Sequence, residues 1–132
     1  MADIQHEIRI DAPPARISDA LSSGETLERL HGARAHLSKE ELRMEFPNGL
    51  VFRWKVLASD PKAVVWKCLE GPGDSVGTEA TFKLSPAKSG HTLVEFSHEG
   101  WPGTHGNFRK CNTRWALILH QLKHEVESAA RH

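Results

Sequence analysis

The stretch "FRKCNTRWALILHQLKHEVESA", residues 108–129, decides the fold because it predicts one long amphipathic helix. Its apolar residues recur every three or four positions and fall within an arc of about 100° on a helical wheel. They are Phe108, Cys111, Trp115, Ile118, Leu119, Leu122, Val126 and Ala129. We expect the helix to begin near Thr104 or His105. A helix of about 25 residues spans nearly 40 Å, which is long for a small domain unless a whole sheet wraps around it.

Upstream of this helix, alternating apolar and polar residues predict a series of antiparallel strands. The alternating segments are residues 4–10, 42–46, 50–58, 64–70, 78–84 and 92–98. Turn residues separate them, and "PNG" at 47–49 is a strong tight-turn signal. After the first segment, "DAPPARISDALS" predicts a short helix capped by Asp11, and residues 25–30 predict a second that ends before Gly32.

The order of these elements predicts an α+β fold. We expect a curved antiparallel sheet of about seven strands, two short helices and a long C-terminal helix packed across the sheet. The 132 residues are predicted to form one domain, 1–132. Seventeen basic residues balance seventeen acidic ones, which argues against nucleic acid as a partner. Cys68 and Cys111 have no metal-ligand spacing, so we expect reduced, buried thiols and no disulfide framework.

The N-terminal residues "MADIQHEIRI" contain acids and alternate in polarity, unlike a secretory signal. No apolar run approaches the roughly 20 residues that a membrane-spanning helix needs. We therefore expect a soluble, cytoplasmic protein with no membrane partner, present as a monomer or homodimer.

Several segments resemble one family. "IQHEIRIDAPPARISDAL", "VVWKCLEGP", "GTEATFKL", "VEFSHEGW" and "CNTRWALILHQLKHEVE" are similar to segments of bacterial relatives of the activator of the heat-shock-protein-90 ATPase. These are SRPBCC-domain proteins of the START and Bet v 1-like superfamily. The resemblance implies the helix-grip fold, with a ligand cavity between the sheet and the long helix. Many relatives carry tryptophans where this chain has Leu30-His31 and Ser75-Val76, and the lost bulk would reshape one end of the cavity.

The candidate cavity residues are those that strand alternation and helical periodicity place on the inward face, together with residues near the end of the last strand and on the last helix. They are His6, Trp54, Trp66, Phe82, Phe96, His98, Trp101, Asn112, Trp115 and Leu119. The aromatic members either fill a core or line a pocket, and periodicity cannot separate these two interpretations. We expect Trp101 to close one end of the cavity, and Asn112 to offer a hydrogen-bonding group at its edge.

His98 is the candidate acid or base, because it ends the last strand in phase with Phe96. If the first and last strands pair antiparallel, His6 and His98 face inward and approach one another. The alternative is a neutral His98 held by a backbone carbonyl, since buried polar groups are normally satisfied. Glu99 could orient His98 or lie in solvent, and strand alternation favours solvent.

Other chemistry has weaker support. His120 and His124 have the helical spacing of two metal ligands, but they lie opposite the apolar stripe and no third ligand completes a set. We expect no metal and no cofactor. Cys111 lies in an apolar stripe where burial makes a thiol inert. The segment "EGPGDSVGT" lacks both phosphate-loop and dinucleotide fingerprints, and we interpret it as a hairpin at the cavity mouth.

Three functions are compatible with these observations. The first is a binding protein for a small apolar or aromatic ligand, without established catalysis. The second is an enzyme of the polyketide cyclase or isomerase type that uses His98 as acid and base. The third, implied by the resemblance, is a chaperone-associated, stress-response interaction module. That role predicts an apolar patch on the outer sheet face, where the sequence instead places Arg53, Lys55, Lys67 and Lys83.

Overall fold

The computed structural model describes residues 2–104 and 106–130. Within them the chain forms seven strands, which are β1 (Ala2–Ile10), β2 (Arg34–Leu37), β3 (Glu41–Glu45), β4 (Val51–Asp60), β5 (Ala63–Glu70), β6 (Glu79–Pro86) and β7 (Thr92–Trp101). The helices of this described part are α1 (Pro14–Leu21), α2 (Gly24–His31), α3 (Asn107–Ala130) and two 3-10 turns, Gly73–Ser75 and Lys88–Gly90.

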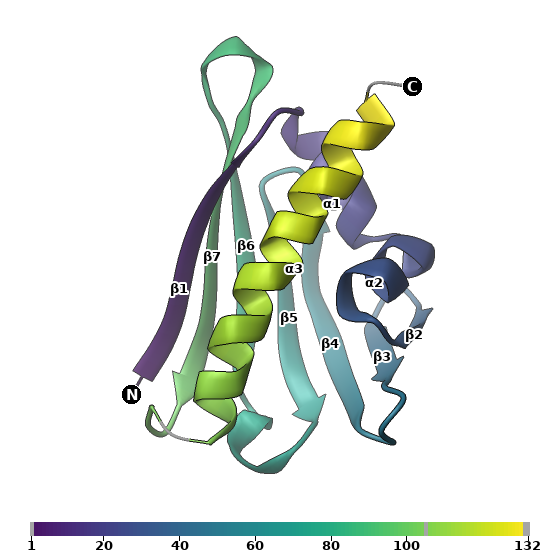
Figure 1. Cartoon of the computed structure of the whole chain (residues 1–132), viewed down its shortest axis with the longest axis vertical. Helices are drawn as coiled ribbons and strands as arrows, with labels where there is room; N and C mark the ends of the chain where they lie inside the picture. Colours follow the sequence, from purple (N-terminus) through teal and green to yellow (C-terminus); the bar gives the residue numbers. More distant parts are fainter. Residues whose placement is uncertain (1, 105, 131–132) are drawn as a thin grey trace.

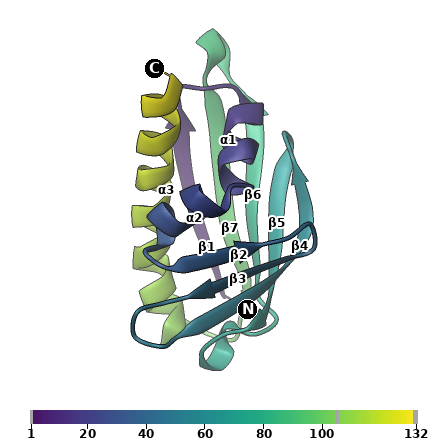
Figure 2. The same cartoon turned by 90° about the vertical axis from the view of Figure 1, so that its right-hand side faces the viewer.

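The strands make one antiparallel sheet in the order β1-β7-β6-β5-β4-β3-β2, so the first strand lies beside the last. Helix α3 runs diagonally across one face of the sheet (Figure 1). Figure 2 shows the short helices α1 and α2 on the same side as α3, with the strands curving around them. The predicted α+β helix-grip architecture is confirmed.

Local sequence explains the short helices. Pro14 occupies the first turn of α1, where its missing N–H costs nothing. Asp11 does not cap this helix, because the N-cap is Pro13 and makes no side-chain hydrogen bond. In α2 the Ser23 hydroxyl accepts a hydrogen bond from the Thr26 N–H, and Gly32 ends the helix with φ 65°.

Strand alternation and the helical stripe build the core between the sheet and α3. Val64, Phe82 and Val94 are fully buried from the sheet side, and Leu122 is fully buried from α3. Lys55, Lys67 and Lys83 are exposed on the outer sheet face. No helix within residues 2–104 and 106–130 has a stretch long and apolar enough to cross a membrane.

Four details differ from the sequence predictions. Strand β2 was not predicted, because "RAHL" is short and pairs only as an edge strand beside β3. Helix α3 begins at Asn107, after Thr104, and His105 lies outside the described residues. Ala129 is exposed although the helical stripe predicted it inward, and Cys111 is only half-buried.

The end of β7 breaks the normal alternation of a strand. Ala2 pairs with Trp101 and Ile4 pairs with His98, so one residue of β1 lies opposite two residues of β7, Glu99 and Gly100. Gly100 lies in this bulge with φ 94°, a backbone conformation that glycine adopts easily. The bulge turns Trp101 inward again, and its ring centre lies 4.8 Å from that of His98.

Candidate functional site

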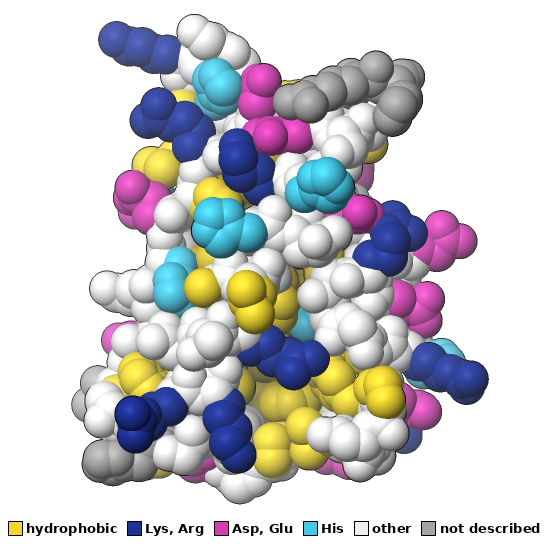
Figure 3. All heavy atoms as spheres, viewed as in Figure 1, with side chains coloured by type: hydrophobic (Ala, Val, Ile, Leu, Met, Phe, Trp, Pro, Cys, Tyr) yellow, Lys and Arg dark blue, Asp and Glu magenta, His cyan; other side chains and the backbone are white. Residues whose placement is uncertain are grey.

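A groove of about 520 Å³ lies between the first half of α3 and strands β3 and β4. Apolar side chains dominate its lining, among them Phe46, Phe52, Trp54, Trp115, Leu117 and Ile118. Figure 3 shows hydrophobic side chains gathered at the lower right of this face, with lysine and arginine side chains beside them. The groove therefore opens onto an aromatic wall whose outer rings, Phe46 and Phe52, are half-buried and whose inner rings, Trp54 and Trp115, belong to the core.

The aromatic wall is ordered by ring contacts between neighbouring strand residues. The rings of Phe52 and Trp54 stack with centres 5.6 Å apart and planes 8° apart. Phe46 meets Phe52 edge-on, with ring centres 6.0 Å apart. Deeper in the molecule, Trp115 contacts Phe96 at 4.4 Å between ring centres. Such contacts fix the shape of the wall, since aromatic pairs prefer particular geometries.

His98 lies fully buried between the helix and the sheet, and both of its ring nitrogens have side-chain partners. The Trp115 indole Nε1 donates to His98 Nδ1 at 2.8 Å. His98 Nε2 lies 2.6 Å from the Thr78 hydroxyl, which donates to the Ser75 carbonyl oxygen at 2.6 Å. Because Nδ1 accepts and the Thr78 proton is already engaged, the proton of the neutral imidazole sits on Nε2. The predicted backbone-carbonyl partner for His98 is therefore wrong, although the neutral state is retained.

Burial sets the protonation of this imidazole. Desolvation lowers the pKa of His98 to about 4 from 6.5. At neutral pH the ring is therefore uncharged, and it has no free nitrogen with which to take or give a proton. Glu99 is exposed on the opposite side of the strand, as alternation predicted.

His6 does not meet His98 as predicted. Parity placed both on one face, but the register pairs His6 with Phe96 and pairs His98 with Ile4. His6 is half-buried, and its Nε2 lies 3.3 Å from the backbone oxygen of Asn112. The two histidines therefore contact different parts of α3.

The remaining candidates divide between the groove and the core. Trp54, His98 and Trp115 line the groove. Trp66, Phe82, Phe96, Trp101 and Leu119 are buried but are not among the described residues that line it. Asn112 is exposed and, like them, is absent from the described lining. Trp101 packs between His98 and Phe108, so it contributes to the core at the lower end of α3.

Sequence reasoning missed His31, the last residue of α2, which lines the groove and is 5% exposed. Its ring meets Trp115 edge-on at 5.8 Å. Desolvation, with a smaller contribution from Arg114, lowers the pKa of His31 to about 3. The Leu30-His31 pair was singled out as a departure from the family pattern, and that signal pointed to this position.

Arg114 and Thr78 were also missed. Arg114 is exposed on α3, donates to the His31 carbonyl oxygen at 2.8 Å and lies over the Phe46 ring at 4.7 Å. Thr78 is the buried partner of His98. Neither contact has a sequence signal, because each joins elements far apart along the chain.

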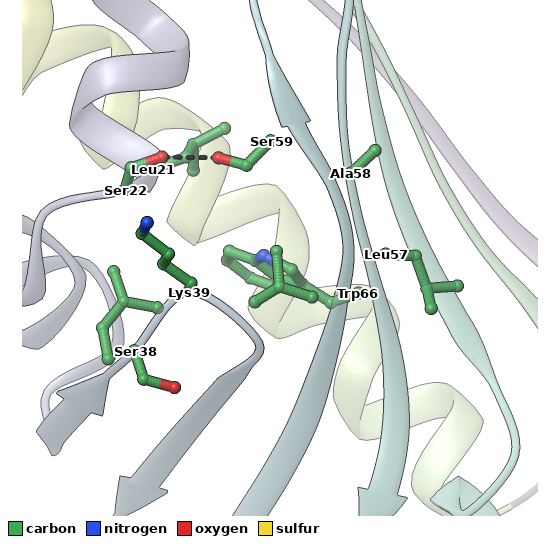
Figure 4. A pocket seen from close by; sticks show the side chains of 10 residues that line it. Leu21, Ser22, Ser38, Lys39, Leu57, Ala58, Ser59 and Trp66 are labelled. Carbon is green, nitrogen blue, oxygen red and sulfur yellow. Dashed lines mark hydrogen bonds between the residues drawn. The ribbon is translucent and has the colours of Figure 1, made fainter.

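A second hollow of about 620 Å³ lies at the other end of the sheet, between α1 and β4. Figure 4 shows Ser22 and Ser59 facing one another across it, with Lys39 nearby and the Trp66 ring at its base; the serine hydroxyls are 2.7 Å apart. Ser22, Lys39 and Ser59 are exposed. This hollow lacks the aromatic wall of the groove, so we place the candidate site in the groove.

Comparison with known proteins places the chain among proteins of this architecture. The solution structure of the Aha1 dimer from Colwellia psychrerythraea is 29% identical, with a TM-score of 0.80, and the match covers 96% of this chain and 97% of that one. A START superfamily protein from Mycobacterium smegmatis is 16% identical with a TM-score of 0.77, over 96% and 98% of the two chains. DynU16, a putative protein in the dynemicin biosynthetic locus, is 14% identical with a TM-score of 0.72, over 96% of this chain and 48% of that chain.

A search of the curated proteins finds no match. The family model described as "Activator of Hsp90 ATPase homolog 1-like protein" matches residues 11–127, which include α1, α2 and most of α3. The chain therefore belongs to the family of activator of Hsp90 ATPase homolog 1-like proteins.

Proposed function

We propose that this protein binds a small apolar or aromatic ligand in the groove between α3 and strands β3 and β4. The observation that carries the proposal is the aromatic wall of the groove, in which half-buried Phe46 and Phe52 lie in front of the buried Trp54 and Trp115. Binding sites for small molecules are typically concave and lined by apolar and aromatic side chains with a few polar groups. At about 520 Å³ the groove has the size of such a site.

Side-chain chemistry favours binding over catalysis. Both nitrogens of His98 are engaged and its pKa is about 4, so it is a poor acid or base at neutral pH. Burial raises the pKa of Cys68 to about 12 and that of Cys111 to about 11, which keeps both thiols protonated. We therefore assign His98 a structural role in shaping the groove.

A chaperone-contact role has less support than ligand binding. Such a role predicts an apolar patch on the outer sheet face. That face instead exposes Lys55, Lys67 and Lys83, and Arg53 pairs there with Glu41 and Glu70. These charges are a poor match for an apolar partner surface.

Two helix substitutions test the groove. Thr113 is exposed and lines it, whereas the neighbouring Asn112 is also exposed and does not belong to its described lining. We expect Thr113→Phe to fill the groove and weaken binding of the neutral fluorescent probe phenylnaphthylamine at least about tenfold. The matched variant Asn112→Phe should bind the probe like the wild type.

The outcome that would end the proposal is equal binding by wild type, Thr113→Phe and Asn112→Phe, or no binding by any of them. Thermal unfolding of both variants provides the folding control. Native mass spectrometry of the protein purified from its host would then identify any ligand retained in the wild type and lost in Thr113→Phe.

A further inference from the structure

The charged side chains that line the groove are cations, and the nearby Asp74 carboxylate accepts a hydrogen bond from the lining residue Asn107. Lys110 and Arg114 line the groove, and no aspartate or glutamate is among its described lining residues. The two cations are four residues apart on α3, so they lie on the same face of the helix. Although the chain has no net charge, two positive charges lie at the rim of this apolar groove.

Arg114 is held in place without an anionic partner. Its guanidinium donates to the His31 carbonyl oxygen at 2.8 Å and lies 4.7 Å from the centre of the Phe46 ring. Arg29, Arg43 and Arg53 each pair with a glutamate, whereas Arg114 pairs with no carboxylate among the described residues. A guanidinium has five N–H donors in a fixed fork, so donors remain for a ligand.

The wall of the groove also has unused hydrogen-bonding capacity. Trp54 Nε1 and His31 Nε2 are buried and have no hydrogen-bond partner within the described protein. Both residues line the groove. The indole N–H can only donate, so it requires an acceptor, and a buried donor without one is costly. Lys110 and Arg114 add cationic donors to the same lining.

We propose that the natural ligand is an aromatic or apolar acid, whose anionic oxygens bind the Arg114 guanidinium while its apolar body lies against the aromatic wall. Lys110 adds attraction as a point charge. Arginine suits this role because its planar fork matches the oxygens of a carboxylate or sulfonate. This inference rests on the proposed function, because it names the class of ligand that the groove accepts.

A matched pair of probes tests the inference. Phenylnaphthylamine and anilinonaphthalene sulfonate share one aromatic body, and only the second carries an anion. We expect the sulfonate to bind the wild type at least about tenfold more tightly, as expected for hydrogen bonds to a charged group. Arg114→Gln should remove this advantage, so that its affinities for the sulfonate and for the neutral probe become similar.

Arg109→Gln is the control, since Arg109 is exposed on the same helix and lies outside the described lining. Arg109→Gln removes one positive charge, as Arg114→Gln does, but from a residue outside the groove. Because salt screens exposed charges, we expect it to alter sulfonate binding by less than about twofold. Arg114→Lys, which keeps the charge and loses the fork, should fall between wild type and Arg114→Gln. Thermal unfolding of each variant provides the folding control.

Two results would overturn the inference in distinguishable ways. Equal affinity of the wild type for both probes, or equal loss in Arg109→Gln and Arg114→Gln, excludes an anion site at Arg114 and leaves apolar binding intact. Failure of both probes to bind, or binding that persists in Thr113→Phe, removes the proposed function and this inference with it.

Discussion

The Trp115 indole donates its hydrogen bond to an imidazole, that of His98, which must stay neutral to accept it. This bond connects α3, where it crosses the sheet, to the last strand, β7. The relationship is directional, because protonation at Nδ1 would set two donors against one another. The Thr78 hydroxyl fixes the other side of the ring, so helix, strand and the loop before β6 are tied through one side chain.

Removing the hydroxyl of Thr78 should destabilise the fold. Thr78→Val keeps the shape of the side chain but leaves His98 Nε2–H without an acceptor in a fully buried site. We expect a loss of about 1–3 kcal/mol in the free energy of unfolding, measured by urea denaturation. The control Thr81→Val, at a half-buried position, should change it by less than about 0.5 kcal/mol. Equal losses in the two variants would refute the network.

Stability should fall as the pH drops below about 6.5. The pKa values of His31 and His98 in the folded protein are about 3 and about 4, below the value of 6.5 for an unperturbed histidine. The unfolded chain therefore binds more protons in this window. The contribution of each neutral histidine to the free energy of unfolding is fully present above pH 6.5. It is lost as the pH falls from 6.5 to the pKa of that histidine in the folded protein, by up to about 1.4 kcal/mol per pH unit.

His31→Phe removes one of the two histidines that take up a proton on unfolding. The ring packs among aromatic neighbours and its Nε2 has no partner in the described protein, so phenylalanine should keep or raise stability at pH 7. Urea unfolding at several pH values should give a shallower decline for the variant than for the wild type. Parallel curves would show that His31 does not take up a proton on unfolding.

Truncating Trp115 should be costly, because the residue is 4% exposed and serves both the core and the groove. We expect Trp115→Ala to lose about 3–5 kcal/mol of unfolding free energy. Leu117→Ala offers a comparison on the same helix, since Leu117 is 67% exposed and should lose less than about 1 kcal/mol. A small loss at Trp115 would mean that its indole is a replaceable wall of the groove.

Both thiols should react slowly in the native protein. With pKa values of about 12 for Cys68 and about 11 for Cys111, little thiolate is present at pH 8. A dithionitrobenzoate assay should show slow labelling in buffer and fast labelling of both residues in urea. Cys111 should react first because it is only half-buried. Rapid labelling of Cys68 in buffer would contradict its burial.

Sequence periodicity predicted which side chains of these strands and of the long helix face the core, but it did not predict which of them contact one another. It placed Phe96 and His98 inward on β7 and Trp115 inward on α3, as the structure has them. Whether His6 would meet His98 depended on strand register, which alternation does not specify. Register pairs His6 with Phe96 instead.

The missed site residues show the same limit. His31 ends a short helix, and only the docking of α2 against the sheet turns its ring towards Trp66 and Trp115. In the sequence, Arg114 has the pattern of an ordinary exposed helix residue, and its contact with the Phe46 ring arises because α3 crosses above that ring. Both positions follow from packing between distant segments, for which a single sequence carries no periodic signal.

The position of β1 at the sheet edge, with β7 as its neighbour, has a consequence for synthesis. A nascent chain leaving the ribosome carries its first strand unpaired until Thr92 to Trp101 has been translated. Closing so long a loop is slow compared with forming local hairpins. We therefore expect the middle hairpins to form first and β1 to pair with β7 last.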